Sequence, residues 1–378
     1  MKKQKKMVFF KLFSILIFMV ACQPDWTITI SSDLERTQLN RSEFNQLMER
    51  FPKNEYCDGL LLEQVFYEKG YEIIESILVK SKNGEEISYQ WAEAAETLCL
   101  NPKGELITNS VPSKPVDIRI VSQKLGGDFV RITDIPATVL AALGLTHDEI
   151  PGTALVEGNF EHVVMIFLDG FGYEKFLEVQ AQGLLDALTR NSEIYRGLTV
   201  YPPRTVTGSA AVLTGLPPKE NGVDQSGIRK TEKTTIFDIA YSAGISSAAV
   251  EGSSLSFNLR NTEVILSGDR DLNGDTDDNV FANTMQIIED DMPRLLWIHF
   301  HGIDDYGHTY GLNAPIVDKK ISEINDYLAQ IYSALPQDTL IIYFADHGMH
   351  SVDEEGRMGN HGHLIYEDMV IPIIIQSK

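Results

Sequence analysis

The sequence predicts an α/β fold: a doubly wound, mostly parallel sheet with helices on both faces, plus a small N-terminal α+β domain. Nearly continuous apolar runs recur along the chain, as expected for parallel strands that are buried on both faces. These runs are 163–168, 246–252, 295–300, 339–345 and 370–375. Helix-like stretches such as 314–335 lie between them. The first third of the chain instead mixes short strand-like and helix-like stretches, and it ends at a polar, proline-containing linker over 109–115.

The start of the chain has the features of a lipoprotein signal peptide. A lysine-rich head precedes an apolar run, and residues 19–22 read Met-Val-Ala-Cys. This ending resembles a bacterial lipobox, so we expect removal of residues 1–21 and lipidation of Cys22. A plain N-terminal membrane helix is the alternative, although the run is short for a full span. The prediction is an exported protein that a lipid anchors to the cell membrane, on its periplasmic or extracellular face.

The charge of the chain argues against general nucleic-acid binding. Residues 1–21 hold five lysines and no acid, so the remaining chain carries 27 basic and 54 acidic residues, a formal net charge of −27. Phosphate backbones are bound by positively charged surfaces. A phosphate-containing small molecule stays compatible with this charge, because a bound metal ion adds positive charge that the count omits.

The N-terminal domain and linker, which we place at 22–115, contain Cys57 and Cys99. In an exported protein these two cysteines could form a disulfide. Two buried free thiols are the alternative. We find no spacing typical of a catalytic site in this domain, and its function stays open.

Three apolar runs of the larger domain, 116–378, are followed by metal-binding side chains. Asp169 follows the first run, HGIDDYGH (301–308) follows the third, and Asp346-His347 follows the fourth. Seven of the nine histidines fall between residues 299 and 363. Ligands of open α/β sheets bind where the strands end. Imidazole and carboxylate together suit zinc and related divalent ions, and there are enough such groups for two ions.

A hydroxyl nucleophile is available in YPPRTVTGSAAVLTG (201–215). Thr205 lies at the predicted start of a helix, where backbone N–H groups are unpaired and the helix dipole is positive. A metal ion can lower the pKa of such a hydroxyl. The alternative is that Thr205 or Thr207 only caps the helix.

Four motifs in this domain resemble the alkaline phosphatase superfamily, most closely its nucleotide pyrophosphatase/phosphodiesterase and phosphonoacetate hydrolase branch. They are FLDGFG (167–172), PRTVTGSAAVLTG (203–215), DDYGHTYG (304–311), and ADHGM (345–349) followed by GNHG (359–362). The resemblance implies a two-metal site, most simply with two zinc ions. One ion would be held by Asp304, His308 and His361, and the other by Asp169, Thr205, Asp346 and His347.

The family pattern also selects between neighbouring residues. Its nucleophile lies nine residues before the threonine of the TG pair, which is Thr205 here, and the resemblance implies a covalent phospho-threonine intermediate. Its third-motif aspartate lies four residues before the histidine, which selects Asp304 over Asp305. His363 is an alternative to His361, because only one residue separates them.

The sequence departs from the family pattern in two places. Nucleotide pyrophosphatases usually have asparagine three residues after the nucleophile, where this chain has Gly208. The segment VRITDIPATVLAALGLTHDEIPGTAL (130–155) resembles one that normally follows the last metal histidine, yet here it precedes the first motif. We therefore predict a circular permutation, in which residues 116–156 supply the family's C-terminal segment.

An acidic segment, SGDRDLNGDTDDNV (267–280), partly matches a calcium-binding EF-hand loop. Asp269, Asp271, Asn273 and Asp275 would be the ligands, but the twelfth position is Val280 instead of glutamate. An acidic, solvated turn is the alternative.

Taken together, the motifs predict a metal-dependent phosphoric ester hydrolase, either a phosphodiesterase/pyrophosphatase or a phosphatase, that acts through Thr205 on a small-molecule phosphate ester. A phosphomonoesterase, a phosphonate hydrolase or a phosphotransferase could use the same residues. A non-catalytic binding lipoprotein is the alternative from another class, but such a protein should have lost ligands, and all seven positions are filled.

Overall fold

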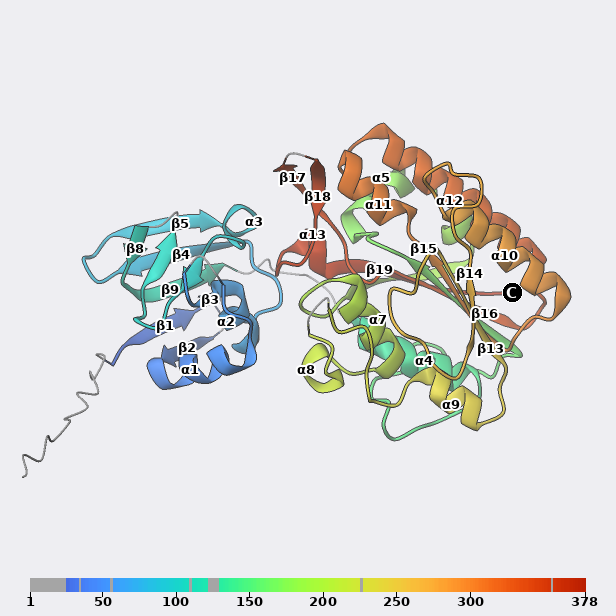
Figure 1. The fold of residues 1–378 in the computed structure, drawn as a ribbon, viewed down its shortest axis with the longest axis horizontal. Coiled ribbons are helices and arrows are strands. Elements are labelled where there is room, and N and C mark those ends of the chain that lie inside the picture. Colours follow the sequence, from blue (N-terminus) through green and yellow to red (C-terminus); the bar gives the residue numbers. More distant parts are fainter. Residues whose placement is uncertain are drawn as a thin grey trace, which may run out of the picture.

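The computed structural model describes residues 25–378, except 34, 55–56, 109–110, 122–128, 225–226 and 355. The predicted signal peptide and Cys22 lie outside these residues. Figure 1 shows a smaller N-terminal domain beside a larger α/β domain. Within the described part of the chain, no helix combines the length and apolar character needed to cross a membrane.

In its described residues, the N-terminal domain contains two sheets and three helices. The five-stranded sheet has the order β2-β1-β9-β4-β5 and the four-stranded sheet has the order β3-β6-β7-β8. The strands are β1 (Thr27–Ser31), β2 (Arg36–Asn40), β3 (Leu60–Leu61), β4 (Ser76–Ser81), β5 (Glu86–Gln90), β6 (Cys99–Leu100), β7 (Leu106–Thr108), β8 (Val111–Ser113) and β9 (Pro115–Val121), and the helices are α1 (Arg41–Arg50), α2 (Leu62–Glu68) and α3 (Trp91–Ala94). This arrangement is the small α+β domain that the sequence predicts.

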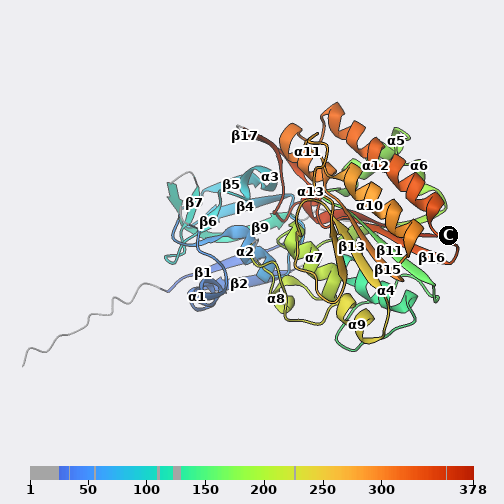
Figure 2. The ribbon, with the colours of Figure 1, turned by 45° about the vertical axis from the view of Figure 1, so that its right-hand side comes forward.

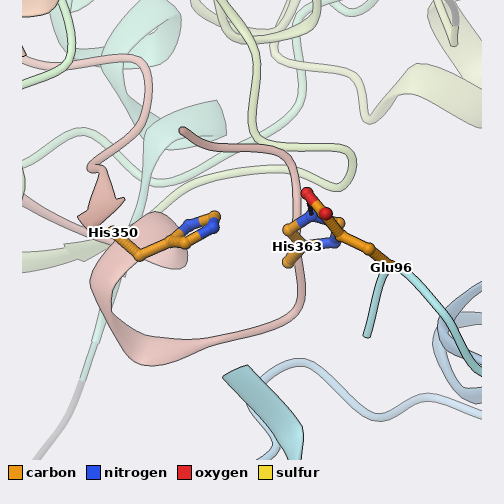
Figure 3. A group of neighbouring side chains, drawn as sticks. All are labelled: Glu96, His350 and His363. Carbon is orange, nitrogen blue, oxygen red and sulfur yellow. Dashed lines mark hydrogen bonds and ion pairs between the residues drawn. The ribbon is translucent and has the colours of Figure 1, made fainter. Parts of the chain in front are cut away.

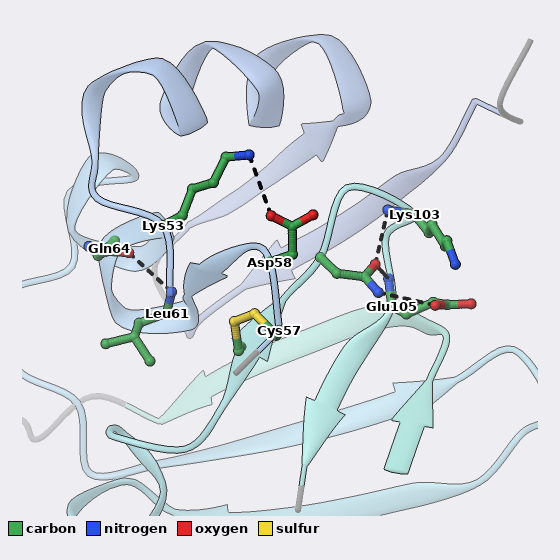
Figure 4. Close-up of a disulfide and its surroundings, with 9 residues drawn as sticks. Lys53, Cys57, Asp58, Leu61, Gln64, Lys103 and Glu105 are labelled. Atoms are coloured by element: carbon green, nitrogen blue, oxygen red, sulfur yellow. Dashed lines mark hydrogen bonds and ion pairs between the residues drawn. A yellow bond between two sulfur atoms is a disulfide. The ribbon is translucent and has the colours of Figure 1, made fainter. Parts of the chain in front are cut away.

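A disulfide joins Cys57 to Cys99 across 42 positions of the sequence, with the two Cα atoms 6.2 Å apart (Figure 4). It links the turn before β3 to β6, the neighbouring strand of the four-stranded sheet. The sequence left open whether these cysteines form a disulfide or stay as two free thiols, and the structure shows the disulfide. Such a crosslink stabilises a domain mainly by restricting its unfolded chain.

The larger domain is built on an eight-stranded sheet with the order β10-β12-β19-β16-β11-β15-β13-β14. Its strands are β10 (Val130–Arg131), β11 (His162–Leu168), β12 (Ser192–Leu198), β13 (Ser247–Glu251), β14 (Glu263–Leu266), β15 (Leu295–Phe300), β16 (Thr339–Phe344) and β19 (Val370–Ser377). All neighbouring pairs are parallel except the two that include β19. The predicted mostly parallel α/β sheet is thus confirmed.

Helices cover both faces of this sheet (Figures 1 and 2). One face carries α5 (Tyr173–Ala181), α6 (Asp186–Thr189), α10 (Asp277–Asp290), α11 (Gly302–Tyr310) and α12 (Pro315–Ala334), and the other carries α4 (Ile135–Ala142), α7 (Thr205–Thr214) and α9 (Ile236–Ser242). The shorter elements are a 3-10 turn (Ile132–Asp134), α8 (Pro218–Asn221), α13 (Tyr366–Met369) and the hairpin of β17 (His350–Glu354) and β18 (Arg357–Asn360). Helix α12 shows how sequence sets this packing, because Val317, Ile321, Ile324, Leu328 and Ile331 recur every three or four residues and are all buried.

All five apolar runs that the sequence singles out are strands of the eight-stranded sheet, but the last is not parallel. Strand β19 pairs antiparallel with β12 on one side and β16 on the other. It reads as a continuous apolar run because both of its faces are covered and it lies inside the sheet. Its first seven residues are buried.

The start of the larger domain differs from our expectation. Strand β9 (Pro115–Val121) pairs with β1 and β4 of the N-terminal domain, so residues 116–121 do not belong to the larger sheet. Farther along, β10 pairs with β12 at the edge of that sheet, and α4 packs against α7 and α9. The circular permutation stays a prediction, and it now concerns residues from β10 onward.

The two domains share an apolar core. Leu198, Tyr201 and Leu364 of the larger domain belong to the same buried cluster as Phe66 and Trp91 of the N-terminal domain. A backbone hydrogen bond from Ile74 N–H to Leu364 O, 2.9 Å long, crosses the boundary. The N-terminal domain is therefore packed firmly against the loops that surround the carboxyl edge of the larger sheet.

Candidate metal centre and active site

The side chains that the sequence selects meet at one edge of the larger sheet. Strands β16, β11 and β15 are parallel neighbours, so their carboxyl ends lie together. Asp169 directly follows β11, Asp346 follows β16 and Asp304 lies in the first turn of α11, after β15. Strand β12 runs in the same direction as β16, because both are antiparallel to β19, and the chain after it leads to Thr205.

The first group of side chains is Asp169, Asp346, His347 and Thr205. One ligand atom from each of Asp169, Asp346 and His347 lies within 4.8 Å of the others. Thr205 is the first residue of α7, and its Oγ1 lies 3.4 Å from Asp169 Oδ1 and 3.4 Å from His347 Nε2. Thr207, in contrast, is fully buried and donates its hydroxyl to the carbonyl oxygens of the turn before α7. Of these two hydroxyls, Thr205 is the one that faces the cluster.

The second group is Asp304, His308 and His361, whose ligand atoms also lie within 4.8 Å of one another. Asp304 Oδ2 is 3.2 Å from His308 Nε2, and Asp304 Oδ1 is 3.9 Å from His361 Nε2. The spacing of four residues places Asp304 and His308 on one face of α11, as expected if the chain turns helical after β15. Asp305 is exposed instead.

The three histidines of these groups are held in the same way. Each Nδ1 lies close to a backbone carbonyl oxygen: His308 to Gly359 O at 2.7 Å, His347 to Gly348 O at 2.9 Å, and His361 to Pro203 O at 2.9 Å. An Nδ1–H that donates to a carbonyl fixes the tautomer and leaves Nε2 as the free base. The Nε2 atoms point into the two groups, which adjoin, since the rings of His347 and His361 stack with centroids 3.7 Å apart.

The site crowds buried carboxylates together, and this crowding shifts their pKa values. Burial raises the pKa of Asp346 to about 8, and the charge of Asp169 adds to the shift. Burial alone would lower the pKa of His347, but Asp346, Asp304 and Asp169 raise it to about 9. Burial and the nearby charge of His347 lower the pKa of His361 to about 2, which keeps that imidazole neutral. At neutral pH Asp346 and His347 therefore carry protons that a divalent cation would have to displace, whereas His361 already has the neutral imidazole that a metal ion requires.

The residues present fit such cations. Asp304 Oδ1 and Asp346 Oδ2, one from each group, are buried and have no hydrogen-bond partner among the described residues, although His361 Nε2 lies 3.9 Å from the first and His347 Nε2 lies 3.2 Å from the second. A buried carboxylate oxygen without a partner is unfavourable unless a charge of opposite sign satisfies it. The donor set of oxygen and imidazole nitrogen suits zinc and related ions. His363 does not join either group, and it lies instead between Glu63 and Glu96.

Asp169 is positioned by a buried chain of hydrogen bonds that ends at Glu251, a residue outside the site that the sequence predicts. Its Oδ2 lies 3.1 Å from Nε2 of His299, whose Nδ1 lies 2.9 Å from Oε2 of Glu251. Burial alone would raise the pKa of Asp169, but hydrogen bonds from His299 and His301 hold it well below its usual value. Glu251 ends β13, the strand next to β15, so an acid at the end of a predicted buried strand was the available signal.

The close packing of α7 against Asp346 explains why position 208 is glycine. A Cβ at this position would lie 2.6 Å from Cβ of Asp346, much closer than ordinary van der Waals contact. Helix α7 therefore passes directly over the strand end that carries Asp346. An asparagine, as in the family pattern, does not fit at position 208 with this spacing between helix and strand.

The two groups open into a cavity of about 650 Å³ with walls from both domains. Thr205, Asp169, Asp304 and His361 line it together with Glu96 of the N-terminal domain. The lining also includes three arginines and two serines: Arg204, Arg229, Arg357, Ser254 and Ser256. Arginine presents donors in a geometry that suits phosphate oxygens.

The acidic loop before α10 is held by its own hydrogen bonds. Asp269 accepts the N–H groups of Asn273 and Gly274, at 3.1 and 3.0 Å, and Asp271 accepts that of Asn273 at 3.3 Å. Asp275 forms an ion pair with Lys320. Among the described residues, the groups close enough to share a metal ion do not include these aspartates. Calcium binding here stays a prediction.

The fold and the grouped aspartate, histidine and threonine side chains agree with the resemblance to the alkaline phosphatase superfamily that the sequence motifs carry. The particular family follows from a match to the family model of type I phosphodiesterase/nucleotide pyrophosphatase over residues 163–367, more than half of the chain. The chain belongs to this family.

Curated relatives match over short segments. The GPI ethanolamine phosphate transferase 2 catalytic subunit of Homo sapiens is 28% identical over 111 residues, which is 28% of this chain and 11% of that protein. GPI ethanolamine phosphate transferase 2 of Yarrowia lipolytica is 35% identical over 68 residues, 18% of this chain and 7% of that protein. The matched segments thus span about a tenth or less of these relatives.

Two solved structures are also similar. Murine ectonucleotide pyrophosphatase/phosphodiesterase 5 is 15% identical with a TM-score of 0.46, over 58% of this chain and 88% of that chain. The phosphonoacetate hydrolase of Sinorhizobium meliloti 1021, solved with phosphonoformate, is 17% identical with a TM-score of 0.41, over 52% of this chain and 58% of that chain.

Proposed function

We propose that this protein is a metal-dependent enzyme that cleaves phosphoric esters through Thr205. One observation carries the proposal: the Thr205 hydroxyl lies 3.4 Å from both Asp169 and His347, at the start of a helix and at the edge of a large cavity. A nucleophile must reach both an activating group and the substrate, and this hydroxyl reaches both.

Two divalent ions, held by the two groups, would lower the pKa of the Thr205 hydroxyl and of a water molecule and would offset the charge of the phosphoryl oxygens. Thr205 Oγ1 then attacks phosphorus, and the ester oxygen leaves on the opposite side. This gives a phospho-threonine, which water hydrolyses in the reverse geometry. Backbone N–H groups of the first turn of α7 point toward the equatorial oxygens and stabilise them as charge builds up.

The residues of the cavity wall favour a substrate that carries further anionic or polar groups beside the phosphoryl group that is attacked. Arg204, Arg229 and Arg357 line the cavity beyond the two groups, which gives donors for further anionic or polar parts of a substrate. Gly208 leaves no side chain at the position where the family pattern has asparagine, so recognition of the phosphoryl group has to come from elsewhere. We assign the chain a phosphodiester or pyrophosphate substrate, with monoesters and phosphonates as the alternatives to test.

Phosphoryl-type transfer is a second candidate function. The curated relatives quoted above are named as ethanolamine phosphate transferases, and a transferase differs from a hydrolase only in the acceptor that attacks the intermediate. Incubation with a diester substrate in the presence of added ethanolamine or glycerol separates the two. A transferase yields the new ester in excess over free phosphate product, whereas a hydrolase yields the hydrolysis product alone.

The location proposed for the enzyme is the outer surface of the cell membrane, through a lipid on Cys22. This proposal rests on the sequence of residues 1–22. A Cys22→Ser variant is expected to leave the membrane fraction and to lose the mass of the lipid. Wild-type chain that carries no lipid, or a variant that stays membrane-bound, contradicts it.

The main test is a substrate panel with the zinc-loaded chain: nitrophenyl phosphate, bis-nitrophenyl phosphate and a nucleotide nitrophenyl ester. Thr205→Ala should lower kcat by about 10³-fold or more on the preferred substrate, because the nucleophile is lost. Its metal content should stay close to wild type, since three other ligands remain in that group. Thr205→Ser is the matched control and should retain measurable turnover. Full activity in Thr205→Ala refutes the mechanism, and no activity of the wild type on any phosphorus ester favours a binding protein.

A further inference from the structure

A third group of metal-binding side chains lies at the boundary between the domains. Glu96, just after α3 of the N-terminal domain, meets His350 at the start of β17 and His363 in the loop before α13. One ligand atom from each residue lies within 4.8 Å of the others. Figure 3 shows the two imidazole rings extending toward the same space, with the Glu96 carboxylate reaching it from the N-terminal domain.

Both histidines of this group are held by buried carboxylates. His350 Nδ1 lies 2.8 Å from Asp368 Oδ1, and His363 Nδ1 lies 3.0 Å from Glu63 Oε2. Asp368 is fully buried and Glu63 is 3% exposed. A carboxylate that accepts the Nδ1–H of an imidazole makes the other nitrogen a stronger ligand and fixes its direction, an arrangement common around zinc. His363 Nε2 lies 3.0 Å from Glu96 Oε1, and a ring nitrogen of His350 lies within 4.8 Å of the same carboxylate.

The spacing suits a tetrahedral ion. Zinc–nitrogen and zinc–oxygen bonds of about 2.0–2.2 Å place neighbouring ligand atoms roughly 3.4 Å apart. His363 Nε2 and Glu96 Oε1 are 3.0 Å apart, and the ligand atom of His350 lies within 4.8 Å of both, so the three atoms span a range that includes that distance. Asn360 donates to the same Glu96 oxygen at 3.1 Å, which holds this carboxylate in place.

We propose that Glu96, His350 and His363 form a third divalent metal site, of the two-histidine, one-carboxylate type that zinc prefers. Three protein ligands leave a fourth position for water or for an atom of a substrate. Glu96 and His363 line the cavity that contains Thr205, whereas His350 lines a second cavity of about 570 Å³. The site therefore lies between two cavities, which give an ion an entry path. It is distinct from the two groups that hold Asp304 and Asp346, and it does not rest on the proposed function.

The alternative to a metal ion is an ion pair of His363 with Glu63 and Glu96, and it explains fewer of the contacts in this group. An imidazolium at His363 between Glu63 and Glu96 would explain the two contacts of that ring. It leaves unexplained why His350, from the hairpin, is oriented by Asp368 toward the same carboxylate. A metal ion explains all three side chains at once, and it predicts a stoichiometry that an ion pair does not.

The test counts metal ions on the full chain. The chain is stripped with a chelator and titrated with zinc, and bound zinc per chain is measured by elemental analysis after dialysis and by calorimetry. We expect three equivalents for the wild type and two for Glu96→Gln and for His350→Gln. In a background with Asp304→Asn and Asp346→Asn, which weakens the other two sites, one equivalent removable by Glu96→Gln should remain.

Matched controls separate metal loss from other effects. His147→Gln removes an exposed histidine that is not part of any of the three groups and should still bind three equivalents. Cobalt substitution gives a second readout, because a four-coordinate ion with two imidazole ligands has visible absorption that the wild type should show and His350→Gln should lose in part. The cobalt spectrum of the chain with Asp304→Asn and Asp346→Asn reports this third group without any substitution within it, and a spectrum without the absorption of a four-coordinate ion there would overturn the proposal.

A zinc count that is the same in the wild type, Glu96→Gln and His350→Gln would overturn the proposal and leave the ion pair. An inactive or unaltered Thr205→Ala enzyme tests the proposed function alone, because that substitution does not change the count at this third group.

Discussion

Gly208→Ala tests how closely the site depends on the packing of α7. The added methyl would lie 2.6 Å from Asp346 Cβ, whereas carbon atoms in contact are about 3.5–4.0 Å apart, so α7 or Asp346 must move by roughly 1 Å. Overpacking of this kind costs about 1–3 kcal/mol, and the better helix propensity of alanine returns about 1 kcal/mol. The net loss of unfolding free energy should therefore be about 0–2 kcal/mol. A displacement of about 1 Å at the reacting atoms costs on the order of 10²-fold in rate.

The measurement is kcat/KM on the preferred substrate together with chemical denaturation of the same samples. Ala211→Gly, one turn along α7, is the matched control: it removes a buried methyl that is not part of the cavity wall. It should lower stability by about 1 kcal/mol or more and leave activity close to wild type. The reasoning is refuted if Gly208→Ala keeps full activity, or if both variants lose activity in proportion to their stability.

Three further predictions follow from the site and the domain structure. Asp304→Asn should lower activity at least 10-fold more than Asp305→Asn, because only Asp304 lies in the second group; the reverse order would mean that the other carboxylate is the ligand. Cys57→Ser should lower the unfolding free energy of the N-terminal domain by about 2–4 kcal/mol through loss of its disulfide, and an unchanged denaturation midpoint would contradict this. The chelated chain should lose stability as pH rises: the pKa values of Asp346 and His347 are raised from 3.8 to about 8 and from 6.5 to about 9, so the folded chain holds protons that the unfolded chain releases. His361, whose pKa is lowered from 6.5 to about 2, opposes this trend below pH 6.5, so the loss of stability is expected between pH 6.5 and 9. A thermal unfolding series in which stability increases between those two pH values would refute the assignment.

The sequence predicted the sheet and the residues around Thr205 because both leave local signals. A strand buried on both faces must be apolar throughout, so β11, β15 and β16 were visible as runs. The metal-binding aspartates come within a few residues after these strands. The spacing of Asp304 and His308 matches one turn of helix. These features depend on neighbours in the sequence.

Features that depend on distant neighbours were not predicted. The direction of β19 is set by the strands on either side, and its apolar run reads the same for either direction. Strand β9 joins the N-terminal sheet because β1 and β4 offer it hydrogen bonds on both edges. Glu96 lies more than 250 positions from His350 and His363, and its surroundings in the sequence resemble an ordinary exposed helix end. Only the packing of the two domains brings these side chains together.

The place of β19 inside the sheet has a consequence for synthesis. β12 and β10 are separated from β16 by this strand, which comes from residues 370–377. Until those residues have left the ribosome, the nascent larger domain consists of two incomplete sheets whose edges are open to pairing with other chains. Chaperone demand and aggregation during translation should therefore be highest just before this last strand emerges.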